Sequence, residues 1–211
     1  MLNNIKNLTY KLLKKSENFF QTDMIYLAKG GFWLTLGQIV SSLSSFFLAI
    51  AFANLLPKEI YGTYKYILSI IGLLSIFTLS GINTALTRSV ARGYEGSIIP
   101  AIKEKIKWGC IGSLISLIIA IYYYINGNAV LATCFIITTL FLPLMDSFNI
   151  HTYFLTGKKN FQLATKYNIL TQIISSFLVI SILVFFKNLF LILLVYFISY
   201  TSIRFIFLKL S

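Results

Sequence analysis

Long stretches without a single charged residue constrain this chain more than any other feature. They cover residues 30–57, 66–87, 108–145, 167–186 and 188–203. A helix that crosses a membrane needs about 20 apolar residues, because the hydrocarbon core is about 30 Å thick. Only 11% of the 211 residues are charged, against about 25% in soluble domains. These features exclude a disordered chain, an average soluble enzyme and a disulfide scaffold, and they predict an all-α polytopic membrane protein.

The longest uncharged run, 108–145, is too long for one span. As a single helix it would measure about 57 Å, nearly twice the hydrocarbon thickness. Asn126, Gly127 and Asn128 lie near its middle and favour a tight turn. The last span contains Arg204, whose side chain is expected to reach the lipid headgroups from near the helix end. We predict six spans, near 32–53, 66–87, 108–125, 129–149, 167–186 and 188–208.

The basic residues predict how the chain is oriented. With six spans, fifteen of the 18 Lys and Arg residues lie on one side, in the N-terminal tail, the loops 88–107 and 151–166, and the C-terminal end. Only Lys58, Lys65 and Lys187 lie on the other side. The positive-inside rule therefore places both termini in the cytoplasm. The same rule accounts for the net charge of +12, so no nucleic-acid partner is expected.

Residues 1–28 form a cytoplasmic tail before the transmembrane bundle of residues 29–211. Apolar residues recur in the tail at helical spacing, with the lysines largely off that stripe. Two interpretations stay open: an interfacial helix on anionic membrane lipids, or an ordinary frayed tail. The stripe consists of Leu2, Ile5, Leu8 and Leu12.

Small residues recur at every fourth position in two of the predicted spans. Residues four apart share one helix face, so such a stripe lets a second helix approach closely. We therefore expect tightly fitted helices at both stripes. They consist of Gly37, Ser41, Ser45, Ala49 and Ala53 in the first span, and of Gly112, Ser116 and Ala120 in the third.

Polar residues gather in the cytoplasmic third of the predicted bundle. Because polar groups in hydrocarbon need a partner or water, we hypothesise a hydrated vestibule that opens inward. Asp146 follows the helix-kinking Pro143 and is a candidate for lining the path or coupling a cation. Asn149 and Asn168 are expected at the membrane interface instead. The candidate cavity-lining residues are Gln38, Asn83, Asp146 and Gln172.

The remaining motifs point to no catalytic or metal site. Tyrosines flank the predicted outer ends of the second and third spans, at 61, 64 and 66 and at 122–124. They fit an aromatic belt and are assigned no ligand. Cys110 and Cys134 are expected to act as small apolar residues within spans. A single histidine, His151, cannot build a metal site, and no enzyme motif accompanies it, so no enzyme, metal or cofactor is expected.

Three segments together resemble a known family. They are KGGFWLTLGQ at 29–38, LLPKEIYGTYKY at 55–66 and GINTALTR at 81–88. In this order and spacing they resemble the N-terminal half of polysaccharide-biosynthesis flippases, in the multidrug/oligosaccharidyl-lipid/polysaccharide exporter superfamily. Matching motifs cover roughly residues 29–92, and beyond them span order and orientation agree. Pro57 and Gly62 have a physical role here, because they end the first helix and let the chain turn into the second.

The resemblance implies a function in the bacterial inner membrane. Such proteins flip an undecaprenyl-diphosphate-linked oligosaccharide to the outer leaflet, for example in O-antigen synthesis. They use two six-helix lobes around a central cavity, and this chain resembles one lobe. A diphosphate needs cationic side chains near the cytoplasmic mouth. Arg88 and Arg92, one helical turn apart, are the candidates, with Lys29 third. Anchoring by the positive-inside rule is the alternative for each.

Six spans are half of what such flippases usually carry. A fragment, a half-transporter that pairs with a second half or with its own copy, and a remnant would each explain this. A cation-coupled drug exporter of the same superfamily and a non-transporting membrane assembly subunit are the alternative functions. A membrane-embedded polymerase or acyltransferase is disfavoured, because the outer loops are short.

Overall fold

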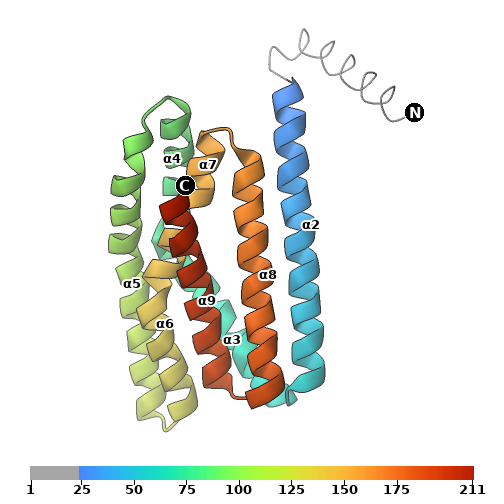
Figure 1. The fold of residues 1–211 in the computed structure, drawn as a ribbon. Coiled ribbons are helices and arrows are strands. Elements are labelled where there is room, and N and C mark those ends of the chain that lie inside the picture. The colour runs from blue at the N-terminus through green and yellow to red at the C-terminus, as the bar shows by residue number, and fades with distance from the viewer. Residues whose placement is uncertain (1–23) are drawn as a thin grey trace, which may run out of the picture.

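The computed structural model describes residues 24–211, which form helices joined by short turns (Figure 1). Six helical stretches in this range are long and apolar enough to cross a membrane. The predicted fold class, an all-α bundle with six spans, is confirmed, and the chain is a multi-pass membrane protein. The five longest helices are α2 (Met24–Leu55), α5 (Ile98–Ile125), α6 (Ala129–Phe148), α8 (Phe161–Phe186) and α9 (Leu189–Leu210).

The first span begins earlier than predicted. Helix α2 extends from Met24 to Leu55, whereas the span was predicted at 32–53. Residues 24–28 of the predicted tail therefore belong to this helix. The expected interfacial helix falls on residues 1–23, which lie outside the described range.

The second span differs most from its prediction at 66–87. Helix α3 runs from Lys58 to Leu74 and continues as a 3-10 turn, Ser75–Thr78. Leu79 then adopts a left-handed conformation with φ 52°, and a separate helix, α4 (Gly81–Ala91), follows. The 21 residues of Lys58–Thr78 already cover about 31 Å, enough to cross the membrane. The span was predicted to start at 66 because Lys58, Glu59 and Lys65 interrupt the uncharged run before that residue.

Other helix ends also extend past the uncharged runs. Helix α5 begins at Ile98 rather than 108, after a 3-10 turn, Glu95–Ser97. Helix α6 is followed by a short helix, α7 (Ile150–Gly157), and α8 begins at Phe161 rather than 167. Polar and charged side chains are tolerated there because the ends of a span reach the interface. The helices are therefore longer than the charge pattern alone indicates.

Asparagine side chains cap three of the helices. Asn128 Oδ1 accepts the Leu131 N–H at the start of α6, and Asn160 and Asn188 act in the same way at α8 and α9. Capping supplies a partner for backbone N–H groups that lack one in the first turn. The predicted turn at 126–128 is confirmed, with Gly127 at a positive φ of 76°.

The two ends of the bundle carry different helix ends and connections. Figure 1 shows the start of α2, the α4–α5 and α7–α8 connections and the end of α9 at one end. The turns after α2, α5 and α8 lie at the opposite end. The loops predicted to carry most of the positive charge therefore share one end, as the six-span topology requires.

Candidate functional site

Two adjoining cavities form a groove between α2, α3, α8 and α9. One, here called the amide cavity, has a volume of about 310 Å³, and the other, the tyrosine cavity, about 340 Å³. The amide cavity is lined by Leu34, Gly37, Gln38, Ser41, Asn149, Thr165, Asn168, Thr171, Gln172, Tyr200 and Arg204. The tyrosine cavity is lined by Ser45, Leu48, Ala49, Phe52, Tyr61, Tyr64, Lys65, Leu68, Gln172, Tyr196, Tyr200 and Arg204.

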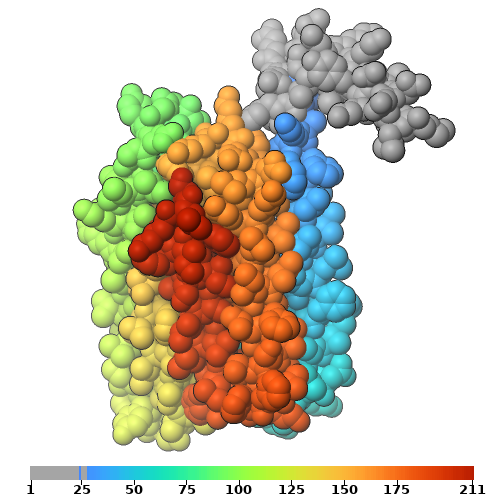
Figure 2. Space-filling model, viewed as in Figure 1, coloured from blue at the N-terminus to red at the C-terminus, as the bar shows by residue number. Residues whose placement is uncertain are grey.

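The groove follows α2 for most of the membrane thickness. Its lining on that helix extends from Leu34 to Phe52, a rise of about 27 Å against a hydrocarbon core of about 30 Å. In the face shown in Figure 2, the surfaces of α9, α8 and α2 lie side by side. The arrangement places polar side chains along a lengthwise path inside an otherwise apolar bundle.

Three side chains line both cavities: Gln172, Tyr200 and Arg204. The Tyr200 hydroxyl donates to Gln172 Oε1 at 2.8 Å. Gln172 Nε2 lies 3.5 Å from Ser45 Oγ on α2. The Arg204 guanidinium carbon lies 5.2 Å from the centroid of the Tyr200 ring. These contacts connect α2, α8 and α9 at the junction of the cavities.

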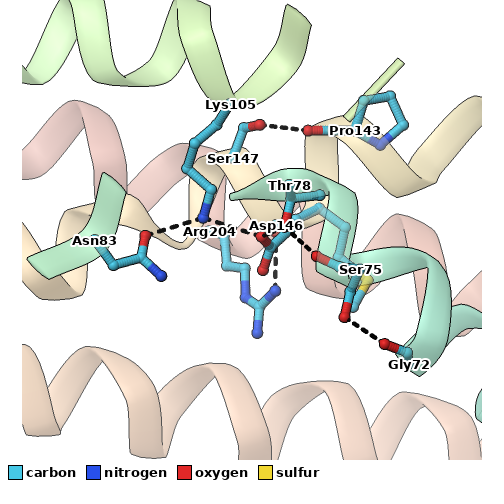
Figure 3. A network of polar contacts seen from close by, with 10 residues as sticks. Gly72, Ser75, Thr78, Asn83, Lys105, Pro143, Asp146, Ser147 and Arg204 are labelled. Atoms are coloured by element: carbon cyan, nitrogen blue, oxygen red, sulfur yellow. Dashed lines mark hydrogen bonds and ion pairs between the residues drawn. The ribbon is translucent and has the colours of Figure 1, made fainter. Parts of the chain in front are cut away.

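Arg204 places a positive charge at this junction. Its Nη1 donates to the backbone oxygen of Met145 at 2.9 Å, in the network drawn in Figure 3. Its Nε is buried and has no hydrogen-bond partner within residues 24–211. An ionised group at membrane depth is costly unless it serves a partner or a path. The guanidinium can therefore donate hydrogen bonds to an anion that enters the groove.

The Arg204 side chain points into the bundle, whereas the sequence predicted that it would reach the lipid headgroups. The sequence placed this side chain at the headgroups, because it lies near the end of the last span. In the structure α9 packs against α6 and α8. The face of α9 that carries Arg204 is directed toward Met145 and the cavities. The sequence could have identified Arg204 as a candidate site residue, because a charged residue inside an apolar span is a functional candidate by default.

A second charged residue that was assigned to a loop is also inside the bundle. Lys105 belongs to α5, and its side chain is 0% exposed. Its Nζ lies 3.0 Å from Asp146 Oδ2 and 3.0 Å from Asn83 Oδ1. Thr78 donates a further hydrogen bond to Asp146. Figure 3 shows these side chains converging. They come from the 3-10 turn Ser75–Thr78 and from α4, α5 and α6, so the network holds together the two sides of the break between Thr78 and α4.

This network holds two of the candidate cavity-lining residues. Asn83 and Asp146 were expected to line the vestibule, but they line neither cavity. Lys105 attracts both of them, since burial of its ammonium requires an opposite charge and acceptors. Gln38 and Gln172 do line the amide cavity, and so do Asn149 and Asn168, which were expected at the interface.

The candidate diphosphate ligands lie elsewhere. Arg88 and Arg92 are exposed on and just after α4, and neither lines the groove. Lys29 lines a separate cavity of about 170 Å³ near Trp33 and the start of α8. The structure does not bring the three cations together at one site.

Two tyrosines expected in the outer belt belong to the groove. Tyr64 is only 2% exposed and lines the tyrosine cavity with Tyr61, so it is not available for the membrane interface. Tyr66 lines neither cavity, and its hydroxyl lies 2.7 Å from that of Tyr123. Tyr64 and Tyr61 lie on one face of α3 because they are three residues apart, a spacing visible in the sequence.

The structure holds no cluster of three or more metal-binding side chains within residues 24–211. The lining of the groove contains two cationic residues, Lys65 and Arg204, and no carboxylate. Its electrostatics therefore favour an anionic ligand.

The sequence was also compared with known proteins. No curated protein and no solved structure matches it. A family model described as "Polysaccharide biosynthesis protein" matches residues 27–211. This match includes all six spans and both cavities. The chain therefore belongs to the polysaccharide biosynthesis protein family.

Proposed function

We propose that this protein moves a lipid-linked oligosaccharide from the cytoplasmic to the outer leaflet of a bacterial inner membrane. The substrate is of the undecaprenyl-diphosphate type, and the flipped glycan serves surface-polysaccharide biosynthesis. The proposed activity is transport and involves no enzymatic step. Family membership and the six spans support the general part of the proposal.

Arg204 is the observation that carries the specific part. A diphosphate brings negative charge into the membrane, where it needs charge-assisted hydrogen bonds. The Arg204 guanidinium lines both cavities and has a buried Nε without a partner in the described chain. Arginine suits this role because it stays charged and presents a planar set of donors.

The orientation is part of the proposal. We assign the end that holds the α4–α5 and α7–α8 connections to the cytoplasm, following the positive-inside rule. The amide cavity lies toward that end, because it is lined by the N-terminal half of α2. A substrate would then enter at the amide cavity and leave past the tyrosine cavity.

A second six-helix bundle is the expected partner of this one. The resemblance implies a cavity between two lobes, which a second half-transporter or a second copy of the chain would supply. The polar lining of the groove favours such a partner, because lipid tails cannot satisfy amide and guanidinium groups.

The alternative of a cation-coupled drug exporter has less support. Cation coupling in the groove would call for a carboxylate, and neither cavity has one. Asp146, the candidate for this role, is paired with Lys105. A non-transporting assembly subunit would require no polar groove along the bundle.

The test is the replacement Arg204→Gln in cells whose glycan export depends on this protein. A charge-assisted hydrogen bond contributes about 1.5–3 kcal/mol, so substrate affinity should fall about 10- to 100-fold, and lipid-linked glycan should accumulate inside. Arg204→Lys should retain part of the activity.

Lys209→Gln is the matched control, because it removes the same charge from an exposed position on the same helix. Export is measured as surface glycan relative to the amount of protein in the membrane. Wild-type export by the Arg204→Gln protein would refute the proposal.

A further inference from the structure

The tyrosine cavity differs in chemistry from the amide cavity beside it. Four tyrosines and Phe52, from helices α2, α3 and α9, make up its aromatic lining, and Lys65 and Arg204 line it as well. Its volume of about 340 Å³ lies at the lower end of the range for small-molecule sites, about 300–1,000 Å³. It is therefore large enough to be a binding compartment with a composition of its own.

Ring packing gives this cavity defined walls. Phe52 and Tyr64 stack with their centroids 4.4 Å apart, and Tyr61 lies 5.8 Å from Phe52. On α9, the Tyr196 and Tyr200 rings lie 4.8 Å apart. Aromatic pairs at such distances contribute beyond their buried area. The first group joins α2 to α3, and the second lies on α9.

Three hydroxyl groups around this cavity lack a partner. Tyr200 donates to Gln172, but the hydroxyls of Tyr61, Tyr64 and Tyr196 make no hydrogen bond to any residue between 24 and 211. Buried tyrosine hydroxyls usually find one. Tyr64 is 2% exposed as a residue, and its hydroxyl keeps some of that exposure, unlike the fully buried, unpaired hydroxyls of Ser113, Ser175, Ser176 and Thr201. The cavity thus offers aromatic faces together with unpaired hydroxyls.

Sugar rings match this combination. A pyranose has a rim of hydroxyl groups and a face of C–H groups, so it can pack on an aromatic ring while it exchanges hydrogen bonds with phenols. A lipid tail or an apolar drug would leave the three hydroxyls unpaired, which costs free energy. A diphosphate would use the cations and leave the ring faces uncovered.

We infer that the tyrosine cavity binds a sugar ring of the transported glycan while Arg204 contacts the diphosphate. This inference rests on the proposed function. The first sugar is bonded directly to the diphosphate, so their two sites must adjoin. They do so in the structure, because Arg204 and Tyr200 line both cavities.

The experiment compares lipids with and without a sugar. The full chain is reconstituted in lipid nanodiscs, and binding is measured for undecaprenyl diphosphate and for a panel of undecaprenyl-diphosphate-linked sugars. The panel carries glucose, galactose, N-acetylglucosamine or N-acetylgalactosamine. At least one glycolipid should bind about fivefold or more tightly than undecaprenyl diphosphate, the equivalent of one net hydrogen bond.

The double variant Tyr64→Phe/Tyr196→Phe should remove this preference. It keeps the rings and deletes two hydroxyls, so the affinity for undecaprenyl diphosphate should stay unchanged. Tyr124→Phe is the matched control, since it makes the same chemical change at an exposed position at the end of α5. If the double variant fails to fold, Tyr196→Phe alone should lower the preference in the same direction.

The outcomes separate this inference from the proposed function. Equal affinity for all the lipids, or a preference that the tyrosine variants leave intact, overturns the sugar site but not transport. Failure of every lipid to bind overturns the proposed function as well. Weaker binding of undecaprenyl diphosphate by Arg204→Gln, together with a sugar preference lost in the tyrosine variants, supports both.

Discussion

Two stripes of small residues in this protein lie in different environments: one is packed against a neighbouring helix, and the other lines the cavities. The α5 stripe, Gly112, Ser116 and Ala120, is buried, and Ser116 Oγ donates to the Phe135 carbonyl on α6 at 3.0 Å. In the α2 stripe, Gly37, Ser41, Ser45 and Ala49 line the two cavities, whereas Ala53 lines neither. In the most apolar windows of the two spans, 28% of the residues are buried on the α5 side and 6% on α2.

The difference arises from the facing helices. Opposite the α5 stripe, α6 presents Phe135 and Leu142, apolar side chains that fill the space. Opposite the α2 stripe, α8 and α9 present Gln172 and Arg204, whose polar groups require hydrogen bonds. Gly37 is in close contact with Thr165 of α8, and Ser45 Oγ lies 3.5 Å from Gln172 Nε2. Small residues therefore permit close approach, but the partner decides whether a packed interface or a groove results.

The α5–α6 interface should be most sensitive to loss of its ion pair, in which Lys105 is buried and Asp146 is 33% exposed. Asp146→Leu leaves the Lys105 ammonium buried without its opposite charge, which should cost about 3–5 kcal/mol of stability. The double replacement Lys105→Met/Asp146→Leu should recover much of it. Thermal unfolding in detergent of the two single variants and the double variant measures the coupling. Additive losses would mean that the pair is not a unit.

Overpacking the α5 stripe should have the next largest effect. A Cβ at Gly112 would lie 3.0 Å from both Leu142 Cδ2 and the Leu74 carbonyl oxygen, and the backbone atom cannot move aside easily. Gly112→Val should therefore destabilise the protein by about 1–3 kcal/mol. The same unfolding measurement applies. An unchanged unfolding midpoint would show that α5 and α6 can separate without cost.

A larger side chain in the α2 stripe should affect export rather than stability. Ser41→Leu adds an apolar side chain to the amide cavity rather than to a packed interface, so stability should change by about 0.5 kcal/mol or less. Export should nevertheless fall by more than half, because the side chain obstructs the polar path. Surface glycan and unfolding temperature are measured on the same preparations. Loss of stability without loss of export would contradict the contrast between the stripes.

The smallest effect is expected outside both regions. Arg88 and Arg92 are exposed and line neither cavity, so Arg88→Gln/Arg92→Gln should change stability by no more than about 0.5 kcal/mol. The double variant should also lose less export than Arg204→Gln in the same assay. A loss as large as that of Arg204→Gln would mean that the proposed diphosphate site lies at Arg88 and Arg92 instead of in the groove.

The candidate site was only partly predictable. Gln38 and Gln172 were identified as cavity-lining residues because a polar amide inside an apolar run is conspicuous. Lys105 and Arg204 were misplaced because a charge near the end of a span can point outward or inward, and sequence spacing does not distinguish the two. Tyr64 was assigned to an aromatic belt for the same reason, since its position along the chain is compatible with either environment.

The number of spans, the turn at 126–128 and the gathering of basic loops at one end follow from local rules. A backbone in lipid must satisfy its hydrogen bonds within each helix, and span length is set by the hydrocarbon thickness. The break after Thr78 and the inward turn of Lys105 and Arg204 arise only when the helices assemble. So does the contrast between a packed stripe and an open one. Helix rotation and packing depend on the side chains of neighbouring helices, which lie far apart in the chain.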